Sequence, residues 1–184
     1  MHPNWFVGLP VAAGAWYEAL PPPPAEVRLF AATDLHATVA FLGAVEESAA
    51  RRAFALAVTW PTGPLDVRLA GLRALGNRRK PSALSVMLGE GAEAVAEGIA
   101  ALRDDMLATA GARPDSRPPL PHVTLARIGR RADARERKAA LAWAEAIDLG
   151  APAVRLDRIA LYTWSADRRA RLFDLVAERP LEGA

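Results

Sequence analysis

The 184-residue sequence contains no cysteine. Disulfide bonds and thiolate metal ligands are therefore excluded, and the composition is compatible with a reducing compartment. No apolar run approaches the roughly 20 residues that cross a bilayer, and residues 1–10 carry no basic stretch ahead of a long apolar one. We therefore expect neither a membrane span nor a signal peptide, and we expect a cytoplasmic protein.

Lysine is almost absent as well. Lys80 and Lys138 are the two lysines among 23 basic residues, so the other 21 are arginines. Guanidinium groups suit bidentate contacts with phosphate, but a net charge of only +2 is weak evidence for a nucleic-acid partner. With 52% hydrophobic and 24% charged residues the chain is typical of a globular protein. We expect one domain over residues 1–184, acting as a monomer.

The sequence pattern predicts strands and helices in a mixed order. Apolar and alternating runs predict strands at Trp5–Leu9, Glu26–Ala31, His36–Leu42, Leu65–Leu72, Ala83–Leu88, His122–Ile128, Val154–Tyr162 and Arg168–Ala177. Helical periodicity predicts helices at Val11–Leu20, Glu46–Val58, Gly91–Ala110 and Arg131–Ile147. This order favours an α+β fold with antiparallel sheets and helices on their outer faces. A three-layer parallel α/β fold is the alternative.

Two of the three histidines open the same short motif. His36 is followed by Thr38, and His122 by Thr124, each with small or apolar residues between and after. On a strand, residues i and i+2 point to the same face, so each histidine lies beside its threonine while the intervening residue is buried. Two such strands side by side place two imidazoles and two hydroxyls in one cleft.

This set of groups suits phosphodiester chemistry. One neutral imidazole can take a proton from an attacking oxygen, and a protonated imidazole can supply one to the leaving oxygen. Threonine hydroxyls can donate hydrogen bonds to the phosphate oxygens. A polar strand edge facing water is the simpler interpretation of one motif, but a repeat in an apolar setting argues against it. A zinc site is the second alternative, but neither motif offers a further histidine, a cysteine or an acidic residue as a third ligand.

The flanking residues carry a resemblance to a known family. The first motif continues as Phe41-Leu42-Gly43, and the second is preceded by Pro121 and followed by Ala126-Arg127. Both segments resemble the paired motifs of the two-histidine (2H) phosphoesterase superfamily. They are most similar to its RNA 2′,3′-cyclic phosphodiesterase branch, formerly described as 2′-5′ RNA ligase and called LigT-like or ThpR.

The resemblance implies a bilobal, pseudo-twofold-symmetric fold of two antiparallel sheets around a central groove, with no metal and no cofactor. It implies that His36 and His122 are the catalytic pair and that Thr38, Thr124 and Arg127 bind phosphate. Arg127 is three residues past Thr124, so it reaches the same face only if the strand bends, bulges or ends between them. Candidate base or ribose contacts are Phe41 and Tyr162, although core packing is the simpler role for Phe41.

The resemblance also implies the reaction. We expect a metal-independent phosphodiesterase that hydrolyses 2′,3′-cyclic phosphate ends of RNA, or of nucleotides, to 2′-phosphates. Alternatives are 2′-5′ RNA ligation, cleavage of 2′-5′ oligoadenylates, a non-catalytic RNA-binding or nucleotide-binding module, and a metal-dependent hydrolase. The sequence leaves open which histidine is the acid and which the base, and a guiding role for the basic turn Arg78-Arg79-Lys80 is less expected than a solvated loop.

Overall fold

The strands pair antiparallel in the order β7-β4-β5-β6-β3-β1-β8-β9, with β2 on β6, in a computed structural model that describes residues 3–77 and 80–182. The strands are β1 (Trp5–Pro10), β2 (Val27–Leu29), β3 (His36–Gly43), β4 (Leu65–Asn77), β5 (Lys80–Leu88), β6 (His122–Ile128), β7 (Ala153–Leu156), β8 (Arg158–Trp164) and β9 (Phe173–Pro180). The helices are α1 (Gly14–Glu18), α2 (Glu47–Ala55), α3 (Ala92–Ala110) and α4 (Ala134–Glu145), with 3₁₀ turns η1 (Ala32–Asp34) and η2 (Leu56–Thr59). The α+β prediction is confirmed.

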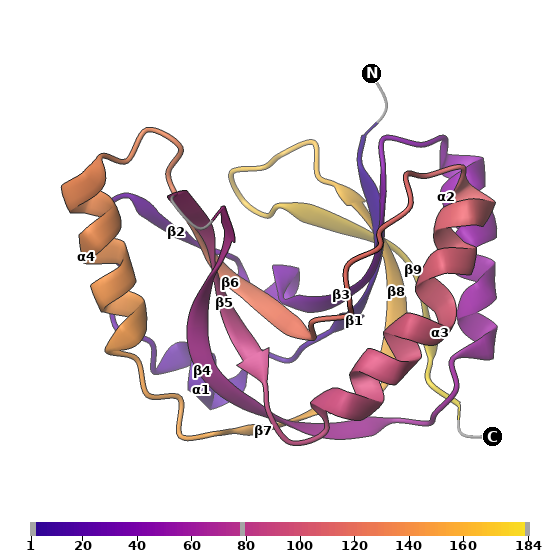
Figure 1. The fold of residues 1–184 in the computed structure, drawn as a ribbon, viewed down its shortest axis with the longest axis horizontal. Coiled ribbons are helices and arrows are strands. Elements are labelled where there is room, and N and C mark those ends of the chain that lie inside the picture. Colours follow the sequence, from indigo (N-terminus) through magenta and orange to yellow (C-terminus); the bar gives the residue numbers. More distant parts are fainter. Residues whose placement is uncertain (1–2, 78–79, 183–184) are drawn as a thin grey trace.

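The sheet has two halves that meet at β3 and β6. One half contains β3, β1, β8 and β9, and the other contains β6, β2, β5, β4 and β7. A single residue pair, Ala37 with Val123, links β3 to β6, whereas the pairings within each half are longer. Helices α2 and α3 cover one half and α4 covers the other (Figure 1). The antiparallel pairing and the outer helices are as predicted, but the two predicted sheets are the halves of one nine-stranded sheet.

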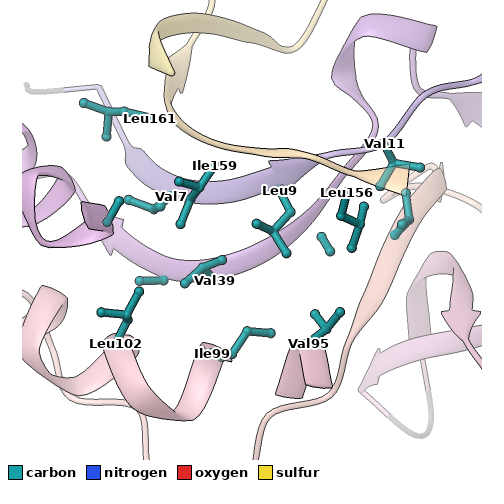
Figure 2. Packing of buried hydrophobic residues seen from close by; sticks show 14 of the residues in the cluster. Val7, Leu9, Val11, Val39, Val95, Ile99, Leu102, Leu156, Ile159 and Leu161 are labelled. Atoms are coloured by element: carbon teal, nitrogen blue, oxygen red, sulfur yellow. The ribbon is translucent and has the colours of Figure 1, made fainter. Parts of the chain in front are cut away.

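The larger core joins apolar residues of both halves of the sheet to helices α2 and α3. Apolar residues of β1 and β3 face α3, with Val7 and Val39 near Leu102 and Ile99 (Figure 2). A second, smaller cluster forms where Ala140 and Ala144 of α4 pack on Leu84, Ala126 and Ile128. Each half therefore buries its outer face, which leaves the inner faces to form the site.

Several helix boundaries follow local sequence signals. Helix α4 starts with a capping box, in which Asp133 accepts from the Glu136 N–H and Glu136 accepts from the Asp133 N–H. Helix α3 ends at Gly111, whose φ of 65° is the left-handed conformation that glycine favours. The helix predicted over Val11–Leu20 is much shorter, because only Gly14–Glu18 is helical before the proline tract.

Two predictions about the strands were wrong in part. The single strand predicted over Val154–Tyr162 is divided at Asp157 into β7, which pairs with β4, and β8, which pairs with β1. The strand predicted from Arg168 begins only at Phe173, because 165–172 form the loop between β8 and β9. Strand β4 continues to Asn77, and strand β5 already begins at Lys80. Arg78 and Arg79 of the predicted basic turn lie outside the described residues.

Candidate active site

The two histidine motifs lie side by side at the junction of the halves. Ala37 of β3 pairs with Val123 of β6, and the strands are antiparallel. This register sets His36 opposite Thr124 and Thr38 opposite His122. A local twofold axis through the pair therefore exchanges the two motifs, and the histidines and threonines alternate around it.

Burial alternates along both motifs as predicted. Ala37 and Val123 are fully buried, whereas Thr38 is exposed and Thr124 partly exposed. The two threonines therefore face the opposite side from the core residues between them. His122 is partly exposed, but His36 is buried, so the two imidazoles do not have the same surroundings.

Each imidazole is held by the backbone two residues before it. Nδ1 of His36 lies 2.7 Å from the carbonyl oxygen of Asp34, and Nδ1 of His122 lies 2.6 Å from that of Leu120. A carbonyl oxygen only accepts, so Nδ1 carries the proton in both rings. Nε2 of each neutral ring then has the free lone pair and can take a proton from a substrate, and once protonated it can give one.

Aromatic rings surround His36. Its imidazole stacks on Phe6 with ring centroids 4.5 Å apart, lies 5.4 Å from Tyr162, and meets the edge of Phe173 at 5.3 Å. The pKa of His36 is lowered from 6.5 to about 4, chiefly by burial and to a smaller extent by the nearby His122, against the opposing effect of the hydrogen bond to Asp34. His36 is therefore neutral at physiological pH in the ligand-free protein.

The absence of a side chain at Gly8 leaves room for the imidazole of His36. A Cβ at Gly8 of β1 would stand 3.2 Å from Cδ2 of His36 and 3.1 Å from the carbonyl oxygen of Ala37. A side chain at this position would therefore crowd the imidazole and the β3 backbone, and both would have to shift to accommodate it.

A buried carboxylate connects the His36 segment to the C-terminal hairpin. Asp34 is 1% exposed, and its two carboxylate oxygens accept the N–H groups of Leu172 at 2.8 Å and Phe173 at 3.1 Å. The same residue's carbonyl oxygen holds His36. Sequence reasoning missed Asp34, and the only available signal was an acidic residue immediately before an apolar strand.

A β-bulge brings Arg127 to the cleft. Along β6, Thr124 pairs with Ser85 of β5 and Ala126 pairs with Leu84, which leaves Leu125 as the extra residue. Leu125 and Ala126 are both fully buried, and the carbonyl oxygen of Leu125 accepts the N–H of Phe30. The bulge shifts the alternation by one residue, so Arg127 lies on the same side as Thr124. This is the irregularity that a cleft position for Arg127 required.

These groups line a cleft of about 520 Å³ between the two halves. The lining includes His36, Thr38, Phe41, Thr124, Arg127, and also Phe6, Arg28, Phe30, Ser82, Ile128, Arg130, Trp164, Arg168, Leu172 and Phe173. His122 is not among the lining residues. The β3–β6 register nevertheless puts it opposite Thr38, which does line the cleft. Four of the lining residues are arginines, a charge pattern that suits an anionic ligand.

The two residues predicted as base or ribose contacts have different surroundings. Phe41 is 56% exposed and lines the cleft, so the expectation that it packs in the core was wrong. Tyr162 is 2% exposed, stacks on Phe6 and does not line the cleft. A base or ribose contact for Tyr162 is therefore not supported: its ring is part of the wall behind His36.

Sequence reasoning also missed Ser85. This residue is fully buried on β5, and its hydroxyl lies 3.5 Å from that of Thr124, where it helps to orient the threonine. Among residues 3–77 and 80–182, no three His, Cys, Asp or Glu side chains come together as a group that could hold a metal ion. In the same part of the chain, no helix is long and apolar enough to cross a membrane.

Comparison with protein families gives one match. The family described as the 2′-5′ RNA ligase superfamily matches residues 15–168, which include both histidine motifs. None of the curated protein sequences matches the chain.

Solved structures share the fold at low sequence identity. The Escherichia coli LigT structure complexed with 3′-AMP is 20% identical, with a TM-score of 0.69 over 98% of this chain and 99% of LigT. The protein TT0787 of Thermus thermophilus is 21% identical, with a TM-score of 0.69 over 98% of both chains. Usb1 of Kluyveromyces marxianus is more distant, at 12% identity and a TM-score of 0.53 over 87% of this chain and 93% of Usb1.

Proposed function

This chain belongs to the 2′-5′ RNA ligase superfamily, and on that premise we propose that it is a phosphodiesterase that hydrolyses 2′,3′-cyclic phosphate ends of RNA to 2′-phosphates. The observation that carries the proposal is the pair of motifs across the β3–β6 junction. Both imidazoles have Nδ1 fixed on a carbonyl and Nε2 free, and each stands opposite the other motif's threonine.

The reaction needs two proton transfers and support for charge on phosphate. One imidazole takes a proton from water as its oxygen bonds to phosphorus, and the other gives a proton to the 3′-oxygen as the P–O3′ bond breaks. Thr38, Thr124 and Arg127 donate hydrogen bonds to the non-bridging oxygens, whose charge they stabilise. The product keeps its phosphate on the 2′-oxygen. We infer that Phe41, which lines the cleft and is 56% exposed, contacts the base or ribose.

Within the same chemistry, the reverse reaction joins RNA ends through a 2′-5′ linkage. Hydrolysis is favoured because water is present at roughly 55 M, whereas a second RNA end must be bound and positioned. Cleavage of 2′-5′ oligoadenylates uses the same groups. A module that only binds RNA does not need two imidazoles with free Nε2 atoms, which argues against it. LigT and related structures include complexes with 3′-AMP, ATP and NADP⁺, which supports nucleotide-like substrates.

The test is hydrolysis of a 2′,3′-cyclic nucleotide in the presence of EDTA, with the product's phosphate position assigned by ³¹P NMR. We expect turnover to a 2′-phosphate without added metal. Activity that disappears in EDTA and returns with zinc or magnesium would contradict the metal-independent mechanism, and a 3′-phosphate product would contradict the proposed bond cleavage.

The histidine roles are tested by variants. His36→Ala and His122→Ala should each lower kcat by roughly 10²–10⁴-fold, and the double variant by less than the product of the two, because both groups act in one step. Wild type should give a bell-shaped pH–rate profile whose limbs belong to the coupled pair. Near-normal turnover by either single variant would remove that histidine from the mechanism.

A further inference from the structure

Arg168 lines the cleft and has hydrogen-bonding capacity that the described residues do not use. It lies in the loop between β8 and β9 and lines the cleft, with its Cζ 4.3 Å from the ring centroid of Trp164. Its Nη1 is shielded from solvent and has no hydrogen-bond partner among the described residues. A shielded guanidinium N–H without an acceptor is unfavourable, so an anionic ligand that accepts from it is bound favourably.

The loop that carries Arg168 is fixed at several points. Arg28 of β2, from the other half of the sheet, donates to the carbonyl oxygens of Arg168 and Arg169. Asp167 accepts the N–H of Arg169 at 3.0 Å, and Asp34 accepts the N–H of Leu172. The guanidinium lies over the Trp164 ring, and this cation–π contact holds it in place. Arg168 is therefore held in place before any ligand binds.

The charge in this cleft exceeds what one phosphate needs. Thr38, Thr124 and Arg127 already provide donors for the phosphate beside the two histidines. Arg168 of the β8–β9 loop and Trp164 at the end of β8 also line the cleft, from the same half of the sheet as Thr38. Phe41 and Trp164, 56% and 41% exposed, supply aromatic faces on which a base can stack.

Resting on the proposed function, we propose that Arg168, oriented by Trp164, forms a second phosphate subsite that binds the phosphate on the 5′ side of the terminal nucleotide. The substrate class is then an RNA end or a 5′-phosphorylated nucleotide that carries a 2′,3′-cyclic phosphate, rather than the cyclic nucleoside monophosphate alone. The hydrolysed bond and the catalytic groups are unchanged, and the subsite acts on recognition.

The experiment compares three substrates: adenosine 2′,3′-cyclic phosphate, its 5′-phosphorylated form, and the dinucleotide ApA with a 2′,3′-cyclic phosphate end. We expect kcat/KM for the wild type to rise about tenfold with either added phosphate, the effect of one charge-assisted contact. We call the ratio of kcat/KM with the added phosphate to kcat/KM without it the phosphate ratio. Arg168→Gln should remove most of this ratio. Arg168→Lys should restore part of it, because the charge returns without the planar fork. A neutral methylphosphonate linkage in the dinucleotide should remove the ratio for the wild type.

Arg171→Gln is the matched control, since Arg171 lies in the same loop but pairs with Asp174 at the surface. It should keep the wild-type ratio. Equal kcat/KM for all three substrates, or a ratio that survives Arg168→Gln, would overturn the subsite while leaving the phosphodiesterase proposal intact. A ratio that appears with the dinucleotide and not with the 5′-phosphate would assign the preference to base stacking and also overturn it.

Failure of the proposed function gives a different result, because no substrate is then hydrolysed by the wild type. In that case calorimetric binding of adenosine 2′-phosphate and of adenosine 2′,5′-bisphosphate still tests the subsite. The bisphosphate should bind more tightly than the monophosphate to the wild type. We expect Arg168→Gln to reduce the ratio of the two Kd values about tenfold, as for loss of one charge-assisted contact. An unchanged difference would overturn the subsite independently of any activity.

Discussion

At the scale of single residues, the threonines provide the most direct test of the phosphate site. Thr38→Val and Thr124→Val keep a β-branched side chain on each strand and remove only the donor. We expect kcat/KM for a 2′,3′-cyclic nucleotide to fall on the order of 10–10³-fold in each variant, as for loss of one donor to a developing charge. Thr163→Val on β8, which is not a cleft residue, is the control. Wild-type rates in both cleft variants would place these hydroxyls outside the site.

The surroundings of His36 make stability depend on pH. Its pKa is about 4 in the folded protein against 6.5 when unfolded, so the unfolded chain binds the proton first as pH falls. The free energy of unfolding therefore decreases as pH falls through 6.5 and continues to decrease to about pH 4, by about 3 kcal/mol in all.

Urea denaturation of wild type and His36→Phe between pH 4 and 7.5 measures this contribution. Phenylalanine keeps the ring contacts and does not titrate, so the part of the pH dependence that belongs to His36 should be missing from the variant. Identical pH dependence in the two proteins would mean that His36 is not shielded as its neighbours indicate.

At the scale of secondary-structure elements, Asp34 couples η1 and β3 to β9. Asp34→Asn keeps the shape of the side chain but replaces one carboxylate oxygen by an NH₂ group. One of the two backbone N–H groups that Asp34 accepts then loses its acceptor. We expect the free energy of unfolding to fall by about 1–3 kcal/mol. Release of Phe173 from His36 should also admit water and raise the pKa of His36 toward 6.5.

NMR titration of His36 in Asp34→Asn measures the second effect, which a purely structural role would not produce. Asp174→Asn is the control, because that carboxylate lies on the same strand and pairs with Arg171. A destabilised variant in which His36 still titrates near pH 4 would limit Asp34 to holding the hairpin.

The elements differ in how well the sequence predicted them. β6 was predicted with both ends correct, since Pro121 precedes it and an apolar alternation fills it. The division at Asp157 could not be predicted, because apolar residues continue on both sides and only pairing with different partner strands separates β7 from β8. For the same reason Arg127 could be placed only conditionally: its position depends on a bulge set by β5 and β2, not by its own strand.

At the scale of the whole molecule, the halves are held together by few contacts at the site itself. The β3–β6 pairing is a single residue pair, and Arg28 adds a second connection through the β8–β9 loop. The meeting of the two motifs could be predicted from sequence because a repeated pattern marks their four candidate residues, whose roles stay predictions. Asp34, Arg28 and Arg168 could not, because their importance comes from contacts with residues more than 130 positions away. One domain over residues 1–184, a monomeric state and a cytoplasmic location stay predictions.

Arg28→Gln should loosen this second connection. Hydrogen–deuterium exchange measured by mass spectrometry should show the 165–172 loop exchanging about 5–10-fold faster, the effect expected for loss of hydrogen bonds to a charged donor. Amides of α3 should be unaffected. Arg155→Gln, which removes an ion pair with Asp66 between β4 and β7, is the control. Unchanged exchange in the loop would show that Asp34 alone holds it.

The local twofold axis between the motifs has a consequence for regiochemistry. A 2′,3′-cyclic phosphate is itself nearly symmetric, with two ester bonds of similar strength to adjacent ribose oxygens. A site with two equivalent imidazoles would accept the ring in either sense and open it to a mixture of isomers. A bulge follows both motifs, at Val39 and at Leu125, but it brings Phe41 to the cleft in the first motif and Arg127 in the second. The imidazole of His36 is enclosed by aromatic rings, whereas that of His122 is partly exposed. On the proposed function, we expect these two departures from symmetry to direct cleavage to one of the two ester bonds.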